Sequence, residues 1–319
     1  MNSMEKVEGF KMPILFCIWA RPELTEKVFE RIREIKPSKL YVAADGWGEK
    51  EKELCQKARD TIKIDWNCDL KTLYREENLG CKYAMSEAIS WFFEREEMGI
   101  ILEDDCYPDI TFFPYCEELL NKYKHDTRSM HISGRDNEND NNFYNGEYSY
   151  YYGRRMHCWG WASWRRAWKY MDLELKSYPQ FEKENAIDKF IFNKKEKANL
   201  KNKFKHLYAS KSKKTWAWPY AYSLLCQGAL CINPRRRLVK NIGINSEMSV
   251  NYNDADVGND IVPMVFPLRH QQFVGVDPEF NNPKWNSYKK TGRKCFSLSI
   301  SDTKIRFVIF WIKFSLRKK

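Results

Sequence analysis

The chain has 319 residues, of which 43% are hydrophobic and 15% aromatic. This composition excludes a disordered protein, and the length allows one large domain or two smaller ones. The formal net charge of +11 favours acidic partners such as nucleotide phosphates, anionic lipid surfaces or nucleic acid.

The first hundred residues alternate between short apolar runs and helical periodicity. Alternation at these lengths predicts a parallel sheet covered by helices, whose ligands lie beyond the carboxyl ends of the strands. There is no GxGxxG motif and no P-loop motif, so a nucleotide would have to be held by side chains and a metal ion. We predict strands at 13–19, 39–44, 69–74 and 99–102, and helices at 24–35, 49–61 and 81–96.

The later part of the chain mixes strands, helices and polar loops. The lysine-rich stretch 176–214 has weak helical periodicity, and we interpret it as a solvated basic face rather than a nucleic-acid site. The polar loops 135–146 and 241–258 are long enough to be functional. We predict strands at 130–134, 147–152 and 229–234, and helices at 109–125 and 215–225.

An acidic tripeptide, Glu103-Asp104-Asp105, follows the apolar run that ends at Leu102. Adjacent like charges repel, and the tripeptide alone leaves two interpretations open: a divalent-cation site shared with a phosphate, or a solvated acidic turn. Arg21 and Asp45 end neighbouring predicted strands, so they lie on the same edge of the predicted sheet. This convergence favours the cation site.

Three other segments are unusual in composition. Residues 158–168 contain four tryptophans, which form either a core cluster or a stacking wall for a ring-shaped ligand, and composition favours the core. Arg235-Arg236-Arg237 and Lys240 form a basic patch suited to a diphosphate or a lipid headgroup. Residues 305–319 interleave aromatic and basic residues, which is typical of an amphipathic membrane-surface anchor or of a terminal helix docked on the core; we favour the anchor.

The N-terminal segment 1–12 is polar and charged and lacks the apolar core of a signal peptide. No stretch reaches the ~18 apolar residues of a spanning helix. The ten cysteines form no CxxC pair and no spaced set with histidine, so we expect reduced thiols. We therefore expect a cytoplasmic protein, with a peripheral contact through 305–319 to the inner face of the cytoplasmic membrane.

Several of these segments together resemble a bacterial GT-A glycosyltransferase. The resemblance is to family 2-like enzymes, in the branch whose nucleotide-sugar domain is similar to eukaryotic N-acetylglucosaminyltransferase I. It extends from about residue 13 to about residue 267. It implies an α/β fold with a mixed, mainly parallel sheet flanked by helices. It also implies a nucleotide-sugar-binding half at 1–150 and a helical and loop-rich acceptor half at 151–270. The composition adds a basic, aromatic tail at 271–319. The resemblance is carried by Ala20-Arg21-Pro22-Glu23, Asp45-Gly46, Glu77-Asn78-Leu79-Gly80, Ile101-Leu102-Glu103-Asp104-Asp105 and Trp159-Gly160-Trp161.

The same resemblance implies roles for individual residues. Arg21 would contact the donor diphosphate, Asp45 the base or ribose, and Asp105 would ligate Mn²⁺ or Mg²⁺. Glu103 and Asp104 would face the donor sugar and the ribose. The nucleotide-sugar site implied in this way takes in Arg21, Asp45, Gly46, Asn78, Glu103, Asp104, Trp159, Gly160 and Trp161.

The chain departs from the family pattern at Ala217, where the branch has an aspartate that is the natural base for an inverting transfer. Three interpretations follow: an inactivating substitution, the use of another carboxylate, or loss of transfer with donor binding retained. The candidate catalytic positions are therefore Ala217 itself, Glu103, and the loop residues Asp136, Glu247 and Asp254.

The predicted function is metal-dependent, inverting transfer of a hexosyl or N-acetylhexosaminyl group from a UDP-sugar. The acceptor would be a saccharide or a lipid-linked oligosaccharide in surface polysaccharide synthesis, and we expect no nucleic-acid partner. A sugar-phosphate nucleotidyltransferase is the first alternative, but Ala20-Arg21-Pro22 lacks the glycines it needs after the first strand. A non-catalytic carbohydrate-binding protein is the second, and it gives the acidic tripeptide no role.

Overall fold

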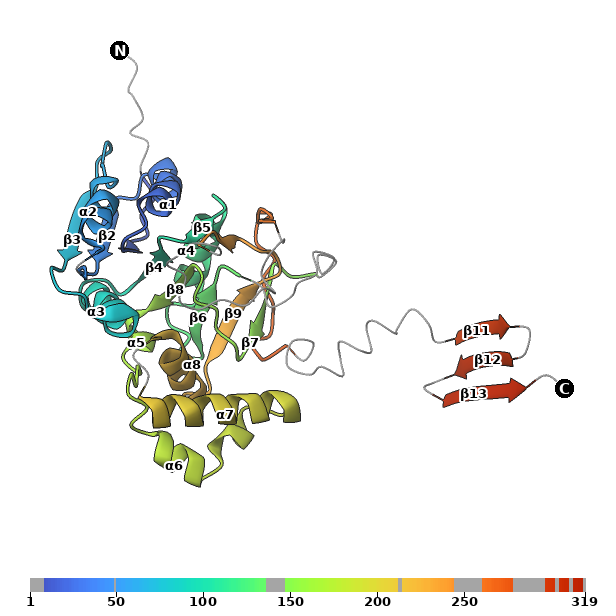
Figure 1. Ribbon diagram of the computed structural model, residues 1–319. Coiled ribbons are helices and arrows are strands. Elements are labelled where there is room, and N and C mark those ends of the chain that lie inside the picture. The colour runs from blue at the N-terminus through green and yellow to red at the C-terminus, as the bar shows by residue number, and fades with distance from the viewer. Residues whose placement is uncertain are drawn as a thin grey trace, which may run out of the picture.

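The computed structural model describes residues 9–48, 50–135, 147–211, 214–243 and 260–277, and the backbone of three short strands after residue 295. Its centre is an eight-stranded sheet with the strand order β3-β2-β1-β4-β8-β6-β9-β7. Helices cover both faces of this sheet (Figure 1). The predicted α/β fold with a mixed sheet flanked by helices is thus confirmed.

Four strands form a parallel half of the sheet. They are β1 (Ile14–Ile18), β2 (Lys39–Ala44), β3 (Asp69–Tyr74) and β4 (Met98–Glu103). The connecting helices are α1 (Pro22–Ile35), α2 (Lys52–Asp60) and α3 (Gly80–Arg95). The predicted alternation of strands and helices is confirmed here, and β2 and β3 have the predicted bounds.

The other four strands form a mixed half. They are β6 (Ser129–Ser133), β7 (Tyr150–Gly153), β8 (Trp161–Trp164) and β9 (Leu230–Pro234). Strand β8 is antiparallel to both β4 and β6, and β6 is parallel to β9. Hence β4, β6 and β9 run in one direction, and their carboxyl ends lie on the same edge of the sheet.

The alternation of side chains along β1 and β2 decides what each face of the sheet contacts. Ile14, Phe16 and Ile18 join one buried cluster with residues of α1 and α4 (Phe112–Lys122). Leu15 and Cys17 join a second cluster with residues of α3 and α8 (Ala217–Cys226). Because both faces are covered, these strands are apolar throughout, as buried parallel strands are.

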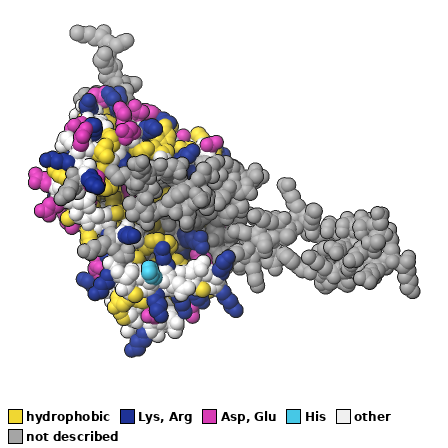
Figure 2. Space-filling model, viewed as in Figure 1, with side chains coloured by type: hydrophobic (Ala, Val, Ile, Leu, Met, Phe, Trp, Pro, Cys, Tyr) yellow, Lys and Arg dark blue, Asp and Glu magenta, His cyan; other side chains and the backbone are white. Residues whose placement is uncertain are grey.

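The segment between β8 and α8 is helical. The α7 helix has a single apolar stripe, in which Phe204 and Leu207 are buried against Tyr222 of α8. Lys and Arg side chains gather on the lower part of the face in Figure 2, where Figure 1 places α6 and α7. This agrees with the predicted solvated basic face. The helical elements are α5 (Arg165–Trp168), α6 (Tyr178–Lys183), η2 (Ala186–Lys189) and α7 (Lys194–Ser210).

The described part of the C-terminal tail forms strands, which corrects the alternative interpretation of residues 305–319 as a terminal helix. Strands β11 (Phe296–Ser301), β12 (Lys304–Ile309) and β13 (Ile312–Arg317) pair with one another as an antiparallel sheet. Phe296, Leu298 and Ile300 alternate with serines, a period of two that favours a strand over a helix. The membrane contact of this tail stays a prediction.

Within the described ranges, no helix has both the length and the apolar character needed to cross a membrane. The nine cysteines in these ranges are free thiols, as the sequence predicts.

Candidate functional site

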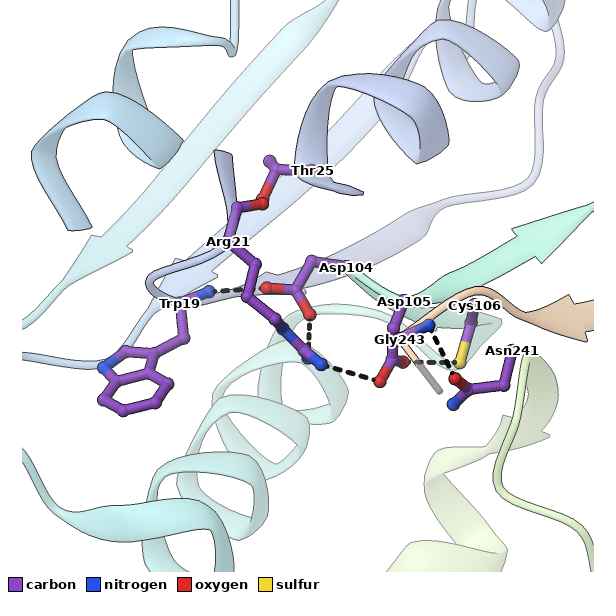
Figure 3. Close-up of polar contacts among 8 residues, drawn as sticks. All are labelled: Trp19, Arg21, Thr25, Asp104, Asp105, Cys106, Asn241 and Gly243. Atoms are coloured by element: carbon purple, nitrogen blue, oxygen red, sulfur yellow. Dashed lines mark hydrogen bonds and ion pairs between the residues drawn. The ribbon is translucent and has the colours of Figure 1, made fainter. Parts of the chain in front are cut away.

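Arg21 joins two of the three acidic residues at the carboxyl edge of the sheet (Figure 3). Its guanidinium forms an ion pair with Asp104 through Nη2 and a second with Asp105 through Nη1, at 2.9 Å to Oδ2. The Asp104 side chain is 2% exposed, whereas those of Asp105 and Arg21 are 16% and 18% exposed. The predicted meeting of the β1 and β4 ends is therefore present.

The local fold explains this geometry. Strand β1 pairs with β4 in parallel, so the chain leaves both strands at the same edge. The backbone N–H of Trp19, just after β1, donates to Asp104 Oδ2 at 3.0 Å. Pro22 starts α1 directly after Arg21, where a missing N–H costs no helix bond. The sequence does not predict this role for Trp19, because the donor is a backbone N–H, which almost every residue type has.

Burial sets the protonation of the acidic residues. Burial, together with the charges of Asp105 and Asp104, raises the pKa of Glu103 to about 8, although the charge of Arg21 acts in the opposite direction. Burial also raises the pKa of Asp104 to about 6, although the charge of Arg21 acts in the opposite direction. For Arg21, burial acts to lower the pKa, but the two aspartates outweigh it and the pKa is raised. The guanidinium is thus a permanent cation between the carboxylates.

Asp45 ties the end of β2 to the start of α3. Its Oδ1 accepts from the backbone N–H of Leu79 at 3.0 Å, and its Oδ2 from that of Gly80 at 3.0 Å. Asn78 donates its side-chain amide to the carbonyl of Gly46 at 3.1 Å. Trp19 Nε1 donates to the same carbonyl at 2.8 Å, which links this group to the acidic residues.

Gly46 has no room for a side chain. A Cβ at this position would lie 2.2 Å from the backbone carbon of Glu77. The close contact between residues 46 and 77 therefore requires glycine. Three residues that the sequence assigned to the nucleotide pocket, Asp45, Gly46 and Asn78, are thus brought together, and their contact with a nucleotide stays a prediction.

A segment far along the chain, residues 239–243, packs against Asp105. Strand β10 (Val239–Asn241) pairs antiparallel with β5 (Cys106–Pro108), and the N–H of Ile242 donates to the carbonyl of Asp105 at 2.8 Å. At Gly243 a Cβ would lie 2.8 Å from Cβ of Asp105 and 3.0 Å from Nη1 of Arg21. The sequence gives no sign of this contact, because more than 130 residues separate the two strands.

Position 217 is the first residue of α8. Ala217 is partly buried and packs against the cluster that contains Cys17 and is bordered by Cys158. Burial raises the pKa of both thiols, and Glu103 raises it further. Position 217 therefore lies against the same buried cluster as these two cysteines, and the alanine places no carboxylate there.

The tryptophan block lies mainly in the core, as its composition favours. Trp161 is fully buried, with its ring 5.5 Å from that of Trp216 and 5.1 Å from that of His131, both stacked. Trp159 is only partly buried and lies 4.4 Å below the guanidinium of Arg135. The carbonyl of Gly160 accepts from the N–H of Gly134 at 2.7 Å. Sugar contact by these residues stays a prediction.

Burial also lowers the pKa of two histidines that the sequence did not single out. The pKa of His131 falls to about 4, and that of His157 to about 3. His131 Nε2 lies 3.0 Å from the carbonyl of His157. The candidate bases Asp136, Glu247 and Asp254 lie outside the described residues.

A divalent cation would have one protein ligand here. Among the described residues, no group of three or more His, Cys, Asp or Glu side chains is placed to hold a metal ion. Mg²⁺ commonly binds through one or two carboxylates plus substrate phosphates, and Asp105 fits that pattern. Its Oδ2 accepts from Arg21, and the thiol of Cys106, a weak donor, lies 3.4 Å from its Oδ1.

No protein-family model and no curated protein sequence matches the chain. Three solved structures have weak overall similarity to it. HddC from Yersinia pseudotuberculosis has 8% identity and a TM-score of 0.28, over 38% of this chain and 57% of HddC. S. aureus TarS 1-349 has 8% identity and a TM-score of 0.33, over 49% of this chain and 47% of TarS. The chain thus spans about half the length of these two structures.

The third structure is the inositol-1-phosphate CTP transferase from T. maritima. It has 8% identity and a TM-score of 0.36, over 71% of this chain and 86% of the transferase.

Proposed function

We propose that the chain is a glycosyltransferase that takes a sugar from a nucleoside-diphosphate sugar, with a UDP-sugar as the first candidate. The observation that carries this proposal is the Arg21–Asp104–Asp105 group at the shared carboxyl edge of β1 and β4. Ligands of such sheets bind at this edge. A guanidinium suits a diphosphate, and a carboxylate beside it suits a divalent cation.

Different residues would contact different parts of the donor. Arg21 is held in place by two aspartates, so it can contact a diphosphate without first being ordered. Asp105 Oδ1 would hold Mn²⁺ or Mg²⁺. When bound, such a cation neutralises the charge on the leaving diphosphate. Asp45 keeps the start of α3 against the end of β2, where the base and ribose would lie.

The transfer forms a bond between an acceptor hydroxyl oxygen and the anomeric carbon. The bond from that carbon to the diphosphate oxygen breaks, the nucleoside diphosphate leaves, and the hydroxyl proton passes to a carboxylate. A base is most effective when its pKa lies near the working pH, and the raised pKa of Glu103, about 8, meets this condition. Attack on the face opposite the diphosphate inverts the anomeric centre.

Thermal unfolding of the full chain with UDP, with and without Mn²⁺, tests the proposal. We expect UDP with Mn²⁺ to raise the melting temperature, because saturation at 100 times Kd stabilises a protein by about 2.7 kcal/mol. Asp105→Asn should remove the part of the shift that depends on Mn²⁺. Asp126→Asn, at a partly exposed aspartate paired with Arg128, is the matched control and should keep it. If no nucleoside diphosphate shifts the transition, the proposal is wrong.

A further inference from the structure

A cavity of about 430 Å³ opens beside the end of β9. Its size is within the range of small-molecule sites. Three arginines, Arg235, Arg236 and Arg269, are among the nine described residues that line it, and none of the nine carries a carboxylate. The same lining includes Phe266 and Val265, which are 39% and 59% exposed.

The walls of this cavity are held by backbone contacts. Ser149 accepts the N–H of Arg235 on its carbonyl at 3.1 Å, and its own N–H donates to the carbonyl of Arg269 at 2.9 Å. The N–H of Arg269 donates to Ser149 Oγ at 2.9 Å. Two arginines 34 residues apart in the chain are therefore fixed on either side of one serine.

The side chains of two of these arginines are also positioned. Arg235 Nη2 forms an ion pair with Asp277 at 3.2 Å, in which the two side chains are 9% and 14% exposed. Arg236 Nη1 donates to the carbonyl of Pro263 at 3.0 Å. Positioned guanidinium groups bind anions with less loss of conformational entropy than free ones.

Three arginines line this cavity, and Asp277 balances the charge of one of them, so the lining keeps a positive character that attracts an anion. Guanidinium groups match phosphate and carboxylate oxygens with paired N–H donors. The exposed ring of Phe266 and the neighbouring Tyr148 offer flat apolar surface next to these donors. A sugar ring that carries an anionic group can satisfy both features: the anionic group contacts the guanidinium groups and the ring lies against the aromatic side chains.

The cavity lies on the same edge of the sheet as the Arg21–Asp104–Asp105 group. Strands β4 and β9 run in the same direction with two strands between them, so their ends are about 14 Å apart at ~4.8 Å per strand. The segment from Arg235 to Gly243 runs from the cavity to Asp105 and contains β10. One continuous piece of chain thus contributes to both places.

We propose that this cavity binds a saccharide that carries a phosphate or carboxylate group. The assignment of that ligand as the sugar acceptor rests on the proposed function, whereas the binding of the anion does not. The phosphate can belong to a soluble sugar phosphate or to a lipid-linked one, and the two sources are separated by the probes below.

Isothermal titration calorimetry of the full chain without nucleotide or divalent cation tests the soluble source. Glucose 1-phosphate should bind saturably, and more weakly as salt increases, whereas glucose should not bind. Arg236→Gln and Arg269→Gln should each weaken binding about tenfold or more. Arg128→Gln changes an exposed arginine outside the cavity and should leave binding unchanged.

Co-sedimentation with phosphatidylcholine vesicles that contain a polyprenyl phosphate tests the lipid-linked source. Binding to these vesicles but not to pure phosphatidylcholine, reduced in the same two arginine variants, would support the proposal with a lipid-linked ligand. The proposal is overturned if both probes fail to bind, or if either binds the two variants as well as the wild type. It is also overturned if UDP with Mn²⁺ displaces glucose 1-phosphate competitively, since the phosphate would then bind at Asp105.

The variants also separate this inference from the proposed function. Arg236→Gln and Arg269→Gln should keep the melting-temperature shift produced by UDP and Mn²⁺. If the wild type shows no such shift but still binds glucose 1-phosphate through these arginines, the donor assignment is wrong and the anion site remains.

Discussion

The parallel half and the mixed half of the sheet bury different kinds of side chain. In the described strands β1, β2 and β4 the fully buried side chains are almost all aliphatic or aromatic, and the charged groups stand at the strand ends. The mixed half instead buries polar groups inside its strands. These are Ser129, His131, Ser133, Ser163 and Asn233, each with no exposed surface.

This difference shows how the two halves are suited to different tasks. Burial and the parallel pairing of β1 with β4 hold the strand ends of this half in place, so Arg21 and Asp104 meet at its edge. Buried polar groups need specific partners, as when Ser163 Oγ donates to the carbonyl of Met130 at 2.7 Å. The mixed half therefore depends on particular contacts between β6, β8 and α8.

The largest expected effect is at Ala217, which packs against a buried cluster to which strands of both halves contribute. If position 217 holds the base, Ala217→Asp should raise turnover by about 10²–10⁴-fold, the usual contribution of a general base. The new carboxylate would be at the first position of α8, where the helix dipole favours a negative charge. Release of UDP from a panel of UDP-sugars with saccharide acceptors measures this.

Ala217→Asn adds a side chain of nearly the same shape without a base and should leave turnover low. An unchanged or lower rate in Ala217→Asp would exclude position 217 as the place of the base and leave Glu103 or a loop carboxylate.

The next largest effect is expected in the core of the mixed half. Trp161→Ala should lower the free energy of unfolding by about 3–5 kcal/mol, because it opens a cavity between Trp216 and His131. Urea denaturation measures this. Trp218→Ala, at a side chain that is 37% exposed, should cost less than about 1 kcal/mol. Similar losses in both variants would contradict the placement of Trp161 in the core.

In the parallel half the sensitive place is the edge. Arg21→Ala should cost roughly 3 kcal/mol, because it leaves the buried carboxylate of Asp104 without its ion pair. Arg33→Ala breaks a pair with Asp65 in which both side chains are about half exposed, and it should cost less than about 1 kcal/mol. Urea denaturation of both variants is the measurement.

A second change sharpens this test. Asp104→Asn removes the stranded charge, so the double variant Arg21→Ala/Asp104→Asn should recover part of the stability lost in Arg21→Ala. A double variant that is less stable than either single one would mean that the charge on Asp104 is not the cause of the loss.

The sequence predicts the parallel half of the sheet better than the mixed half, because the apolar strands of the parallel half are easier to recognise. The bounds of β2 follow from an apolar run, and the meeting of Arg21 with Asp104 and Asp105 follows from apolar strands that run in the same direction. No local sequence pattern predicts that β8 lies between β4 and β6. In the sequence, the residues of β8 stand out only as part of the tryptophan-rich segment 158–168. No such pattern predicts the pairing of β10 with β5 either.

Per pH unit, the smallest expected effect is a pH dependence that belongs to the mixed half. Burial lowers the pKa of His131 to about 4, so between pH 6.5 and 4 the unfolded chain binds a proton at this residue that the folded chain does not. Stability from His131 is therefore present above pH 6.5 and is lost as the pH falls, by up to about 1.4 kcal/mol per pH unit. His157, with a pKa lowered to about 3, acts in the same direction.

His131→Phe keeps a ring against Trp161 and removes the titrating group. Urea denaturation at several pH values between 4 and 6.5 should show a slope of stability against pH that is smaller in the variant by about 1.4 kcal/mol per unit. The difference between the two proteins isolates this histidine, because the carboxylates of the acidic edge titrate in both. Parallel slopes would mean that His131 takes up its proton in the folded state at its ordinary pKa, and hence that β6 does not exclude water as a buried central strand should.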